Sequence, residues 1–456
     1  MTTRTTAESL AEFARDLRLE DVPCDVVDKA KTLILDSVGC AIGGQRTPFG
    51  QAAIRMAFEE EREGSLPIMG SRDKTTLPWA IYVNSYLANC LDFDDVHDVT
   101  GHPGATIVPP ALTWAMAGGS SGAAVLRSVI AAYEVSIRIA EGCRSSRERS
   151  RVVAGYSTFQ IFGTTVALGL LAGLSAAEMA DALALTGPHA TVPFVRKSGR
   201  QDRPYSWIKN NYGWAALGGY LAVNLAGQGF RGNRTLLDGD RGFWRMAGSD
   251  NCDPDRFCDG LGTQWRLTQV DVKPYPCCRH IHAALGAVRR ALAEAGHPDT
   301  TDVMMIEVAS DPDLIRDFLV YRPQDVVDAQ FSLPYTVALL VLGVTPGYEW
   351  LDKGNWDRSE LWQTADKVRG RAVETPEPER LGGRWAGCRV VLRDGSEHTA
   401  VATAPSESLD GPQVAAKFGR LAVPVLGQKA LGVAEWLARV EAQANCESLI
   451  PLLGLE

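Results

Sequence analysis

Residues 388–401, CRVVLRDGSEHTAV, separate this chain from an all-helical protein. The Asp394-Gly395 pair is a strong signal for a two-residue turn between antiparallel strands, so the segment predicts a β-hairpin. Two shorter β-rich runs precede it, at residues 265–272 and 303–309. Helical patterns lie between these runs, at residues 282–295 and 332–342. The mixture predicts an α+β unit in this part of the chain.

The sequence on both sides of this unit is helical in pattern. Leu10, Phe13, Ala14 and Leu17 follow the i, i+3, i+4, i+7 spacing of an amphipathic helix. The same period recurs in residues 27–41, 78–90, 105–115, 123–141, 162–174, 176–185 and 214–227. Gly43-Gly44 should end the second of these helices. Helical periodicity returns from Gln413 onward, and we expect this tail to rejoin the first helical layer.

The size and composition of the chain favour a folded protein of two domains. Its 456 residues exceed the roughly 250–300 at which a single core stops growing, so we expect two domains with a cleft between them. Hydrophobic residues at 45% and charged residues at 22% are typical of globular proteins. A net charge of −9, spread along the chain, argues against nucleic acid as a partner.

The sequence also predicts a cytoplasmic protein with no membrane partner. The first residues, MTTRTTAESLAEFARDL, lack the apolar core of a signal peptide. The longest apolar runs, such as TVALLVLGV after Tyr335, are shorter than the roughly 20 residues that span a bilayer. Most of the ten cysteines stand singly in apolar patterns, which fits reduced, buried thiols. Because no pair has CxxC spacing, neither a zinc ribbon nor an iron–sulfur cluster is indicated.

The densest group of ionisable side chains is DFDDVHDVTGHP, residues 92–103. A helix pattern resumes directly after it, so His102 should lie near a helix N-terminus, where free N–H groups favour an anion such as a carboxylate. Carboxylates crowded with histidines shift one another's pKa values, which suits acid–base chemistry. Two other interpretations remain open, a solvated loop with helix caps and a divalent metal site.

A second cluster, KPYPCCRHIH at residues 273–282, opens the next helix. Lys273 and Arg279 bring cations to this helix start, and a guanidinium is well shaped for bidentate carboxylate binding. His280 and His282 are candidates for the same site, although each could equally be a capping or core histidine. Lys209 is a third candidate, because Trp207, Ile208 and Trp214 flank it; an ordinary surface lysine is the alternative.

Several motifs are absent from the sequence. We find no GxGxxG after a strand, no GxxxxGK[ST], no GxSxG and no metalloprotease motif. Neither a nucleotide nor a flavin is therefore indicated.

Taken together, these clusters resemble those of the MmgE/PrpD family, which includes 2-methylcitrate dehydratase, cis-aconitate decarboxylase and iminodisuccinate epimerase. The matching segments span almost the whole chain in the family's order. They are LDSVGCAIGG (35–44), ANCLDFDDVHDVTGHPGATIVPPAL (88–112), AAYEVSIRIAE (131–141), KNNYGWAALGGYLAVNLAGQGFRG (209–232), KPYPCCRHIHAAL (273–285), DAQFSLPYTVA (328–338) and KFGRLA (417–422).

The resemblance implies a mostly α fold with an α+β lid. A large all-helical domain would comprise residues 1–264 and 405–456, and the smaller α+β domain would comprise residues 265–404. It further implies a homodimer with no metal and no organic cofactor. The family's positions for catalysis correspond to Asp92, His102, Lys209 and His282. Candidate substrate-binding residues are Tyr156, Lys273, Arg279 and His280.

Three positions depart from the family's pattern. A histidine expected ahead of the helix around Gly163 is replaced by Ala154, with Tyr156 as the nearest polar aromatic residue. A polar residue expected four positions after Asp92 is Val96. Lys209 aligns only with a one-residue shift relative to Gly213. These departures predict a specialised member with its own substrate or outcome.

The working hypothesis is a cofactor-independent lyase acting on a small di- or tricarboxylate. In a dehydration, a proton would leave the carbon α to a carboxylate and a β-hydroxyl would then be lost. In a decarboxylation, the same cationic groups, Lys209 and Arg279, would bind the substrate and stabilise negative charge. His102 or His282 would be the base or acid, and Asp92 would orient one of them. The alternatives are an epimerase or isomerase of a dicarboxylate, a metal-dependent lyase using the acidic loop, and a non-catalytic carboxylate-binding protein.

Overall fold

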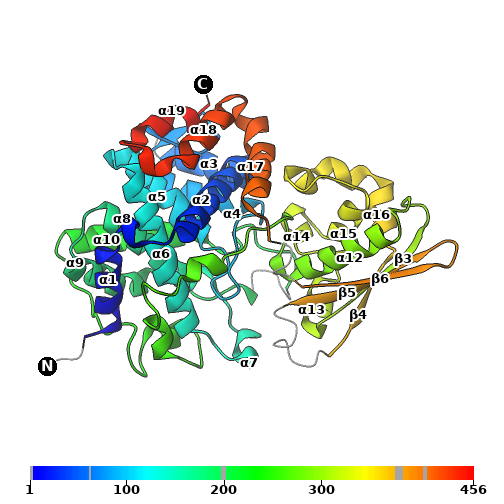
Figure 1. Ribbon diagram of the computed structural model, residues 1–456, viewed down its shortest axis with the longest axis horizontal. Helices are drawn as coiled ribbons and strands as arrows, with labels where there is room; N and C mark the ends of the chain where they lie inside the picture. Colours follow the sequence, from blue (N-terminus) through cyan, green and yellow to red (C-terminus); the bar gives the residue numbers. More distant parts are fainter. Residues whose placement is uncertain (1–3, 61–62, 197–201, 375–383, 404–407, 456) are drawn as a thin grey trace.

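The computed structural model describes residues 4–60, 63–196, 202–374, 384–403 and 408–455, and it shows a large helical domain beside a smaller α+β domain (Figure 1). The mostly α fold class with an α+β domain is thus confirmed. In these ranges, no helix has both the length and the apolar character needed to cross a bilayer.

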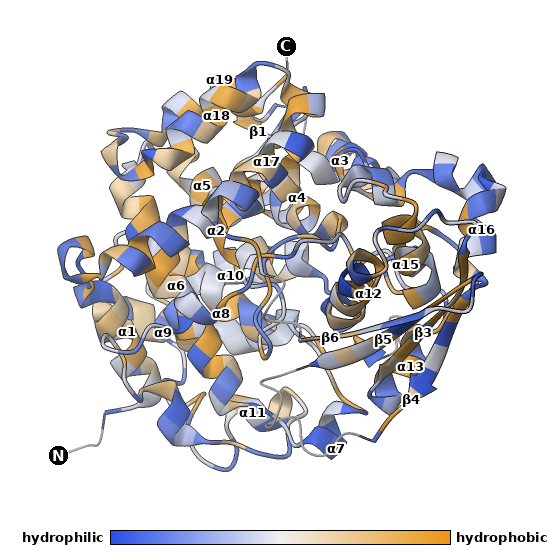
Figure 2. Ribbon diagram, turned by 45° about the vertical axis from the view of Figure 1, so that its right-hand side comes forward, coloured by the Kyte–Doolittle hydropathy of each residue, from blue (hydrophilic) through white to orange (hydrophobic). Residues whose placement is uncertain are grey.

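The helical domain is built from amphipathic or wholly buried helices that pack on one another. Its longer helices before the α+β domain are α1 (Thr6–Asp16), α2 (Cys24–Gly44), α3 (Pro48–Glu60), α4 (Leu77–Cys90), α5 (Gly104–Gly118), α6 (Gly122–Gly142), α8 (Ser157–Leu171), α9 (Ala176–Thr186) and α10 (Tyr212–Gly227). Shorter elements are β1 (Leu66–Pro67), β2 (Lys74–Thr75), α7 (Arg147–Ser150) and α11 (Phe243–Met246). Figure 2 shows apolar segments along α5 and α6, and most residues of both helices are buried.

The C-terminal helices α17 (Gly411–Leu426), α18 (Lys429–Ala438) and α19 (Ile450–Leu453) return to the helical domain. Helix α17 lies against α2, so a helix near the C-terminus packs beside one from the first 44 residues (Figure 1). Glycine allows this close approach, since a Cβ at Gly39 of α2 would lie only 2.9 Å from Phe418 Cδ2 of α17. The expected division at residue 264 stays a proposal, and the expected boundary at 404–405 lies outside the described residues.

The α+β domain contains a four-stranded sheet with the order β4-β3-β5-β6. Its strands are β3 (Val303–Ser310), β4 (Val368–Ala372), β5 (Trp385–Leu392) and β6 (Glu397–Thr403). Its helices are α12 (His282–Glu294), α13 (Pro312–Phe318), α14 (Val326–Ala329), α15 (Leu333–Val341) and α16 (Ser359–Ala365). Strands β5 and β6 form the expected hairpin, and α12 packs against both of them. Every second residue of β5 up to Val390 is buried, as the pleat requires.

The predicted strand at residues 265–272 is wrong. The chain there forms a 3-10 turn, Arg266–Gln269, followed by a single antiparallel bridge between Asp271 and Val96. Leu267 is buried, and its backbone N–H donates to the Glu134 carboxylate of α6 and not to a neighbouring strand. Strand β4 was missed, since it is an edge strand whose residues are mostly exposed and include Arg369 and Arg371.

Candidate active site

The acidic loop runs from the end of α4 to the start of α5. Asp92 follows the last turn of α4 with a φ of 50°, and its N–H donates to Asn89 O at 3.0 Å. Further along the loop, Val96 and Asp271 exchange two backbone hydrogen bonds of 2.8 Å each. This bridge fixes the loop to the segment that carries Lys273, two residues after Asp271.

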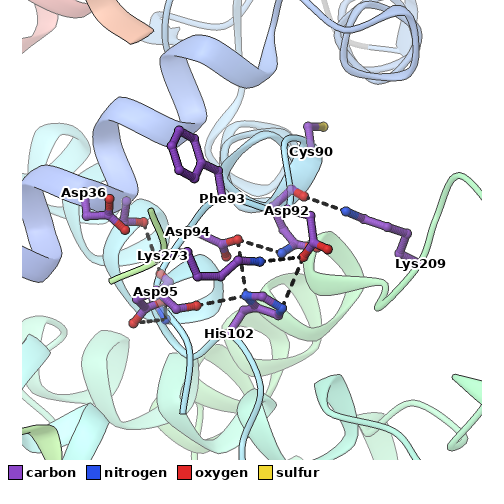
Figure 3. A network of polar contacts seen from close by, with 12 residues as sticks. Asp36, Cys90, Asp92, Phe93, Asp94, Asp95, His102, Lys209 and Lys273 are labelled. Atoms are coloured by element: carbon purple, nitrogen blue, oxygen red, sulfur yellow. Dashed lines mark hydrogen bonds and ion pairs between the residues drawn. The ribbon is translucent and has the colours of Figure 1, made fainter. Parts of the chain in front are cut away.

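Asp92 lies between two candidate residues (Figure 3). Its Oδ1 is 3.0 Å from Lys273 Nζ and 3.4 Å from His102 Nε2. Both Asp92 and Lys273 are buried. The three side chains therefore form one connected group, although residues 92 and 273 are far apart in the sequence.

Charge pairing decides the ionisation of this group. Burial alone would raise the pKa of Asp92, but Lys273, Lys209 and His102 together outweigh it and hold that pKa well below its usual range. Burial would likewise lower the pKa of Lys273, but the carboxylates of Asp92 and Asp94 outweigh it and raise the pKa. The site thus holds a carboxylate and an ammonium out of contact with bulk water.

The contacts of His102 fix the orientation of its ring. Its Nδ1 lies 2.9 Å from the Asp95 carbonyl oxygen, which can only accept a hydrogen bond. Nδ1 therefore carries a proton, and Nε2 faces the Asp92 carboxylate, with Oδ1 at 3.4 Å.

The N-terminus of α5 is already occupied by a side chain of the protein itself. Gly104 N–H donates to Asp95 Oδ1 at 3.0 Å, and Tyr133 Oη donates to Asp95 Oδ2 at 2.7 Å. We expected this helix terminus to hold a substrate carboxylate. Asp95 takes that position, so the anion site must be formed by other groups.

Lys209 reaches the site from the loop before α10. It has a φ of 40°, and its buried Nζ donates to Asn89 O and Gln330 Oε1, both at 3.0 Å. Gln330 in turn donates to the Cys90 carbonyl at 2.9 Å. Burial lowers the pKa of Lys209, and Asp92 offsets part of this shift.

These groups surround a cavity of about 50 Å³ between the two domains, which we call the inner pocket. Six of the eight candidate residues line it, namely Asp92, His102, Tyr156, Lys209, Arg279 and His280. Val96, the departure from the family's pattern, also lies in its wall. Lys273 is not part of the pocket wall, but its Nζ contacts the Asp92 carboxylate, which is.

Arg279 offers hydrogen-bond donors to the inner pocket. One of its nitrogens, Nη2, contacts Asp271 Oδ2, whereas the buried Nε and Nη1 have no hydrogen-bond partner among the described residues. Buried donors without a partner are costly, and a bound carboxylate would satisfy them.

His282 is placed differently from our expectation. It is 0% exposed, its Nε2 lies 3.1 Å from the Cys277 carbonyl oxygen, and it is absent from the wall of the inner pocket. Burial, Arg279 and Lys273 hold its pKa well below the usual value. His282, the first residue of α12, thus faces the protein interior, and we assign it no proton transfer. His280 lies in the wall, with its ring stacked on Phe318.

Sequence reasoning missed residues that hold the site together. Lys417 of α17 pairs with Asp36 Oδ1 at 2.6 Å and donates to the carbonyl oxygens of Phe93 and Lys273, directly beside the Asp92–Lys273 pair. Gln330 and Lys417 both fall in segments that carry the family resemblance, and this was the only available signal. Neither belongs to a local cluster of ionisable residues.

One set of side chains in the described ranges has the spacing of a metal site. Ligand atoms from Asp92, Asp94 and His102 lie within 4.8 Å of one another. Lys273 already contacts Asp92 Oδ1, however, and its ammonium would repel a divalent ion there. The donor set is compatible with a cation only if Lys273 moves away or loses its proton.

The fold and the pocket define a two-domain protein with an interior site lined by buried acidic and basic side chains. The chain belongs to the MmgE/PrpD family: the MmgE/PrpD N-terminal domain matches residues 8–253, and the MmgE/PrpD C-terminal domain matches residues 275–439. The predicted membership is thereby confirmed.

Proteins of known activity resemble the chain over most of its length. It is 24% identical to a cis-aconitate decarboxylase of Aspergillus terreus, over 99% of this chain and 95% of that protein. It is 26% identical to the cis-aconitate decarboxylase of Homo sapiens, over 88% of this chain and 83% of that protein. The family and these names indicate a lyase-type enzyme.

Proposed function

We propose that this protein is a cofactor-independent lyase that decarboxylates or dehydrates a small di- or tricarboxylate. The observation that carries the proposal is the contact of Asp92 with both His102 and Lys273 at the wall of the inner pocket. The names of the relatives support a carboxylate substrate and favour decarboxylation between the two outcomes.

In both outcomes His102 would exchange a proton with the carbon next to a carboxylate. In a decarboxylation the C–C bond to the leaving carbon dioxide breaks, its electron pair stays on carbon, and protonated Nε2 delivers the proton. In a dehydration Nε2 removes the α-proton, and the electron pair left on carbon expels the β-hydroxyl. An acid protonates this hydroxyl so that it leaves as water, and Tyr156 is our candidate for that acid. Lys209 and Arg279 would stabilise the negative charge of the intermediate.

The cations of the pocket support a reaction without a metal. Lys209 and Arg279 bring to the substrate the positive charge that a metal ion supplies in other lyases. The metal-dependent alternative retains one supporting observation, the spacing of Asp92, Asp94 and His102. It predicts loss of turnover with a chelator and recovery with one divalent ion.

The decisive experiment follows candidate acids in D2O by NMR. Purified protein is incubated with cis-aconitate, citrate, 2-methylcitrate and iminodisuccinate, with and without chelator. Carbon dioxide release with deuterium in the product identifies a decarboxylase, and alkene formation identifies a dehydratase. Deuterium uptake without net reaction identifies the epimerase alternative. Tight binding with neither turnover nor exchange would overturn the lyase proposal in favour of a binding protein.

His102→Gln is the first variant to test. Glutamine keeps a hydrogen-bonding side chain of similar reach but transfers no proton, so turnover should fall by roughly 100-fold or more. His398→Gln is the control, because His398 lies on β6 and does not line the inner pocket. Near-normal turnover of His102→Gln would remove His102 from the mechanism.

We also propose that the protein is a homodimer. Apolar side chains are exposed on and just before α10, where Trp214 and Leu221 are seven residues apart and therefore share one face of the helix. Trp207 and Ile208 extend the exposed apolar surface on the preceding loop. A face of this kind supports association with a second copy of the chain.

A further inference from the structure

A second and much larger cavity adjoins the inner pocket. Its volume is about 500 Å³, and we call it the chamber. Asp98, Tyr156, His280 and Arg384 line both cavities. These four side chains therefore form the partition between the inner pocket and the chamber.

Small residues line the chamber on the side of the helical domain. Ala154 and Gly155 line it just before α8, and Ala247, Gly248 and Ser249 line it just after α11. The backbone is tightly packed there, since a Cβ at Gly155 would lie 2.6 Å from Pro193 Cα. Ala154 stands where the family pattern predicts a histidine, so this chain has a methyl group where a ring would fill space.

The charges of the chamber favour an anion. Among the described residues, six arginines and four aspartates line it, an excess of two positive charges. The aspartates are already paired with arginines: Asp311 with Arg147, Asp313 with Arg151 and Arg316, Asp317 with Arg316, and Asp98 with Arg384. Arg144 lines the chamber outside these pairs and adds most to the attraction for an anion, whereas Arg196 donates to the Ser150 carbonyl oxygen at 3.0 Å.

Apolar side chains line the same space. Phe159, Leu314, Phe318 and Trp385 face the chamber together with the arginines. Apolar walls combined with a few charged groups are typical of sites that bind an organic ligand and fix its orientation.

We propose that the chamber is a second subsite, which takes an apolar arm with an anionic end from a substrate larger than a tricarboxylic acid. The carboxylate-bearing head of that substrate would occupy the inner pocket, and the arm would pass Tyr156 and Ala154 into the chamber. The inference rests on the proposed function for the head group. It adds that Ala154 is a specificity-determining residue, since a larger side chain there would close the path.

The test compares three probes by isothermal titration calorimetry: succinate, 2-benzylsuccinate and 2-(4-carboxybenzyl)succinate. The benzyl arm should strengthen binding about tenfold by burying its ring. The added carboxylate should strengthen it by a further factor of about three through the arginines. Equal affinities for the three probes would overturn the proposal.

Two variants separate the shape of the chamber from its charge. Ala154→Phe should weaken both arm-bearing probes about tenfold and leave succinate within about twofold. Val152→Phe is its matched control, because Val152 lies in the same segment, is 67% exposed and does not line the chamber. Arg144→Gln, at an exposed position, should weaken only the carboxybenzyl probe. Equal weakening of succinate by Ala154→Phe would show a general disturbance and contradict the subsite.

Failure of the subsite and failure of the lyase proposal give different results. Turnover of cis-aconitate, citrate, 2-methylcitrate and iminodisuccinate is measured by NMR in D2O with the same protein samples. Turnover of one of these acids without a preference for the arm-bearing probes in calorimetry retains the reaction and removes the subsite. Preferential binding of the carboxybenzyl probe without turnover of any of these acids retains the subsite and removes the reaction.

Discussion

Asp92 and Lys209 share an unusual backbone conformation. Both have positive φ values, 50° and 40°, which cost a non-glycine residue about 1–3 kcal/mol each. The Asn89 carbonyl accepts hydrogen bonds from the Asp92 N–H and from Lys209 Nζ. One carbonyl group thus helps to hold two strained residues, and strain of this kind is common where side-chain position matters more than stability.

Asp92→Asn should destabilise the protein in a pH-dependent way. Asparagine tolerates positive φ, so the change removes the charge without adding backbone strain. Loss of the partner of buried Lys273 should cost about 3–5 kcal/mol at pH 7. Because the pKa of Asp92 is lowered in the folded state, its contribution is present above the unfolded pKa of about 3.9 and is lost as pH falls further.

Urea unfolding of wild type and Asp92→Asn at pH 7, 5 and 3 measures this effect. The difference in the free energy of unfolding should be equal at pH 7 and 5 and smaller at pH 3. A difference that stays constant down to pH 3 would show that Asp92 does not stabilise the fold through its charge.

The sequence predicts the polar residues of the site better than it predicts their supports. Asp92 and His102 stand in one dense cluster, so their proximity follows from local sequence. Lys417 contacts the Phe93 carbonyl across 324 positions of sequence, and no local pattern reveals that contact. His282 shows the converse limit: a histidine at a helix start can face the pocket or the core, and only packing decides which.

At the scale of elements, the N-terminus of α5 depends on Asp95. This carboxyl accepts from Gly104 N and Tyr133 Oη, and both donors are buried. Asp95→Ala should therefore cost about 2–4 kcal/mol, because it leaves two buried donors without a partner. Asp95→Asn keeps an acceptor and should cost less than about 1 kcal/mol at pH 7.

The pH dependence provides an internal check on the Asp95 prediction. Burial and the neighbouring Asp94 raise the pKa of Asp95 well above its usual value, so folding disfavours its charged form. The stabilising contribution is present below the unfolded pKa and is lost as pH rises through the folded one. Thermal unfolding should show Asp95→Asn gaining stability relative to wild type between pH 4 and 8. An asparagine variant as unstable as the alanine variant would contradict this role.

The helices were more predictable than the strands for a physical reason. Helices such as α6 bury a continuous face whose 3.6-residue period is visible in the sequence. The hairpin of β5 and β6 was visible through its turn residues, whereas the exposed edge strand β4 has no apolar alternation. Within residues 265–272 the apolar side chains of Leu267, Val270 and Val272 are buried where the segment packs on α6 and the acidic loop, and this pattern resembles that of a strand.

At the scale of the molecule, the site exists only because the two domains meet. Asp92, His102 and Lys209 come from the helical domain, whereas Arg279 and His280 come from the α+β domain. Ion pairs cross between the domains beside the chamber, Arg147 with Asp311 at 2.9 Å and Arg151 with Asp313 at 3.1 Å. Exposed pairs contribute little to stability, so the buried contacts of Asp92 with Lys273 and of Lys209 with Gln330 hold the two domains together more strongly than these pairs do.

The exposed face of α10 predicts the oligomeric state. If this face is the dimer interface, Leu221→Lys combined with Trp214→Glu places charges inside it, and the protein should become monomeric. Sedimentation equilibrium should give twice the chain mass for wild type and the single chain mass for the double variant. Leu431→Lys is the control, because Leu431 is 65% exposed on α18 and should leave the dimer intact. A double variant that remains dimeric would place the interface elsewhere, and a monomeric wild type would overturn the dimer proposal.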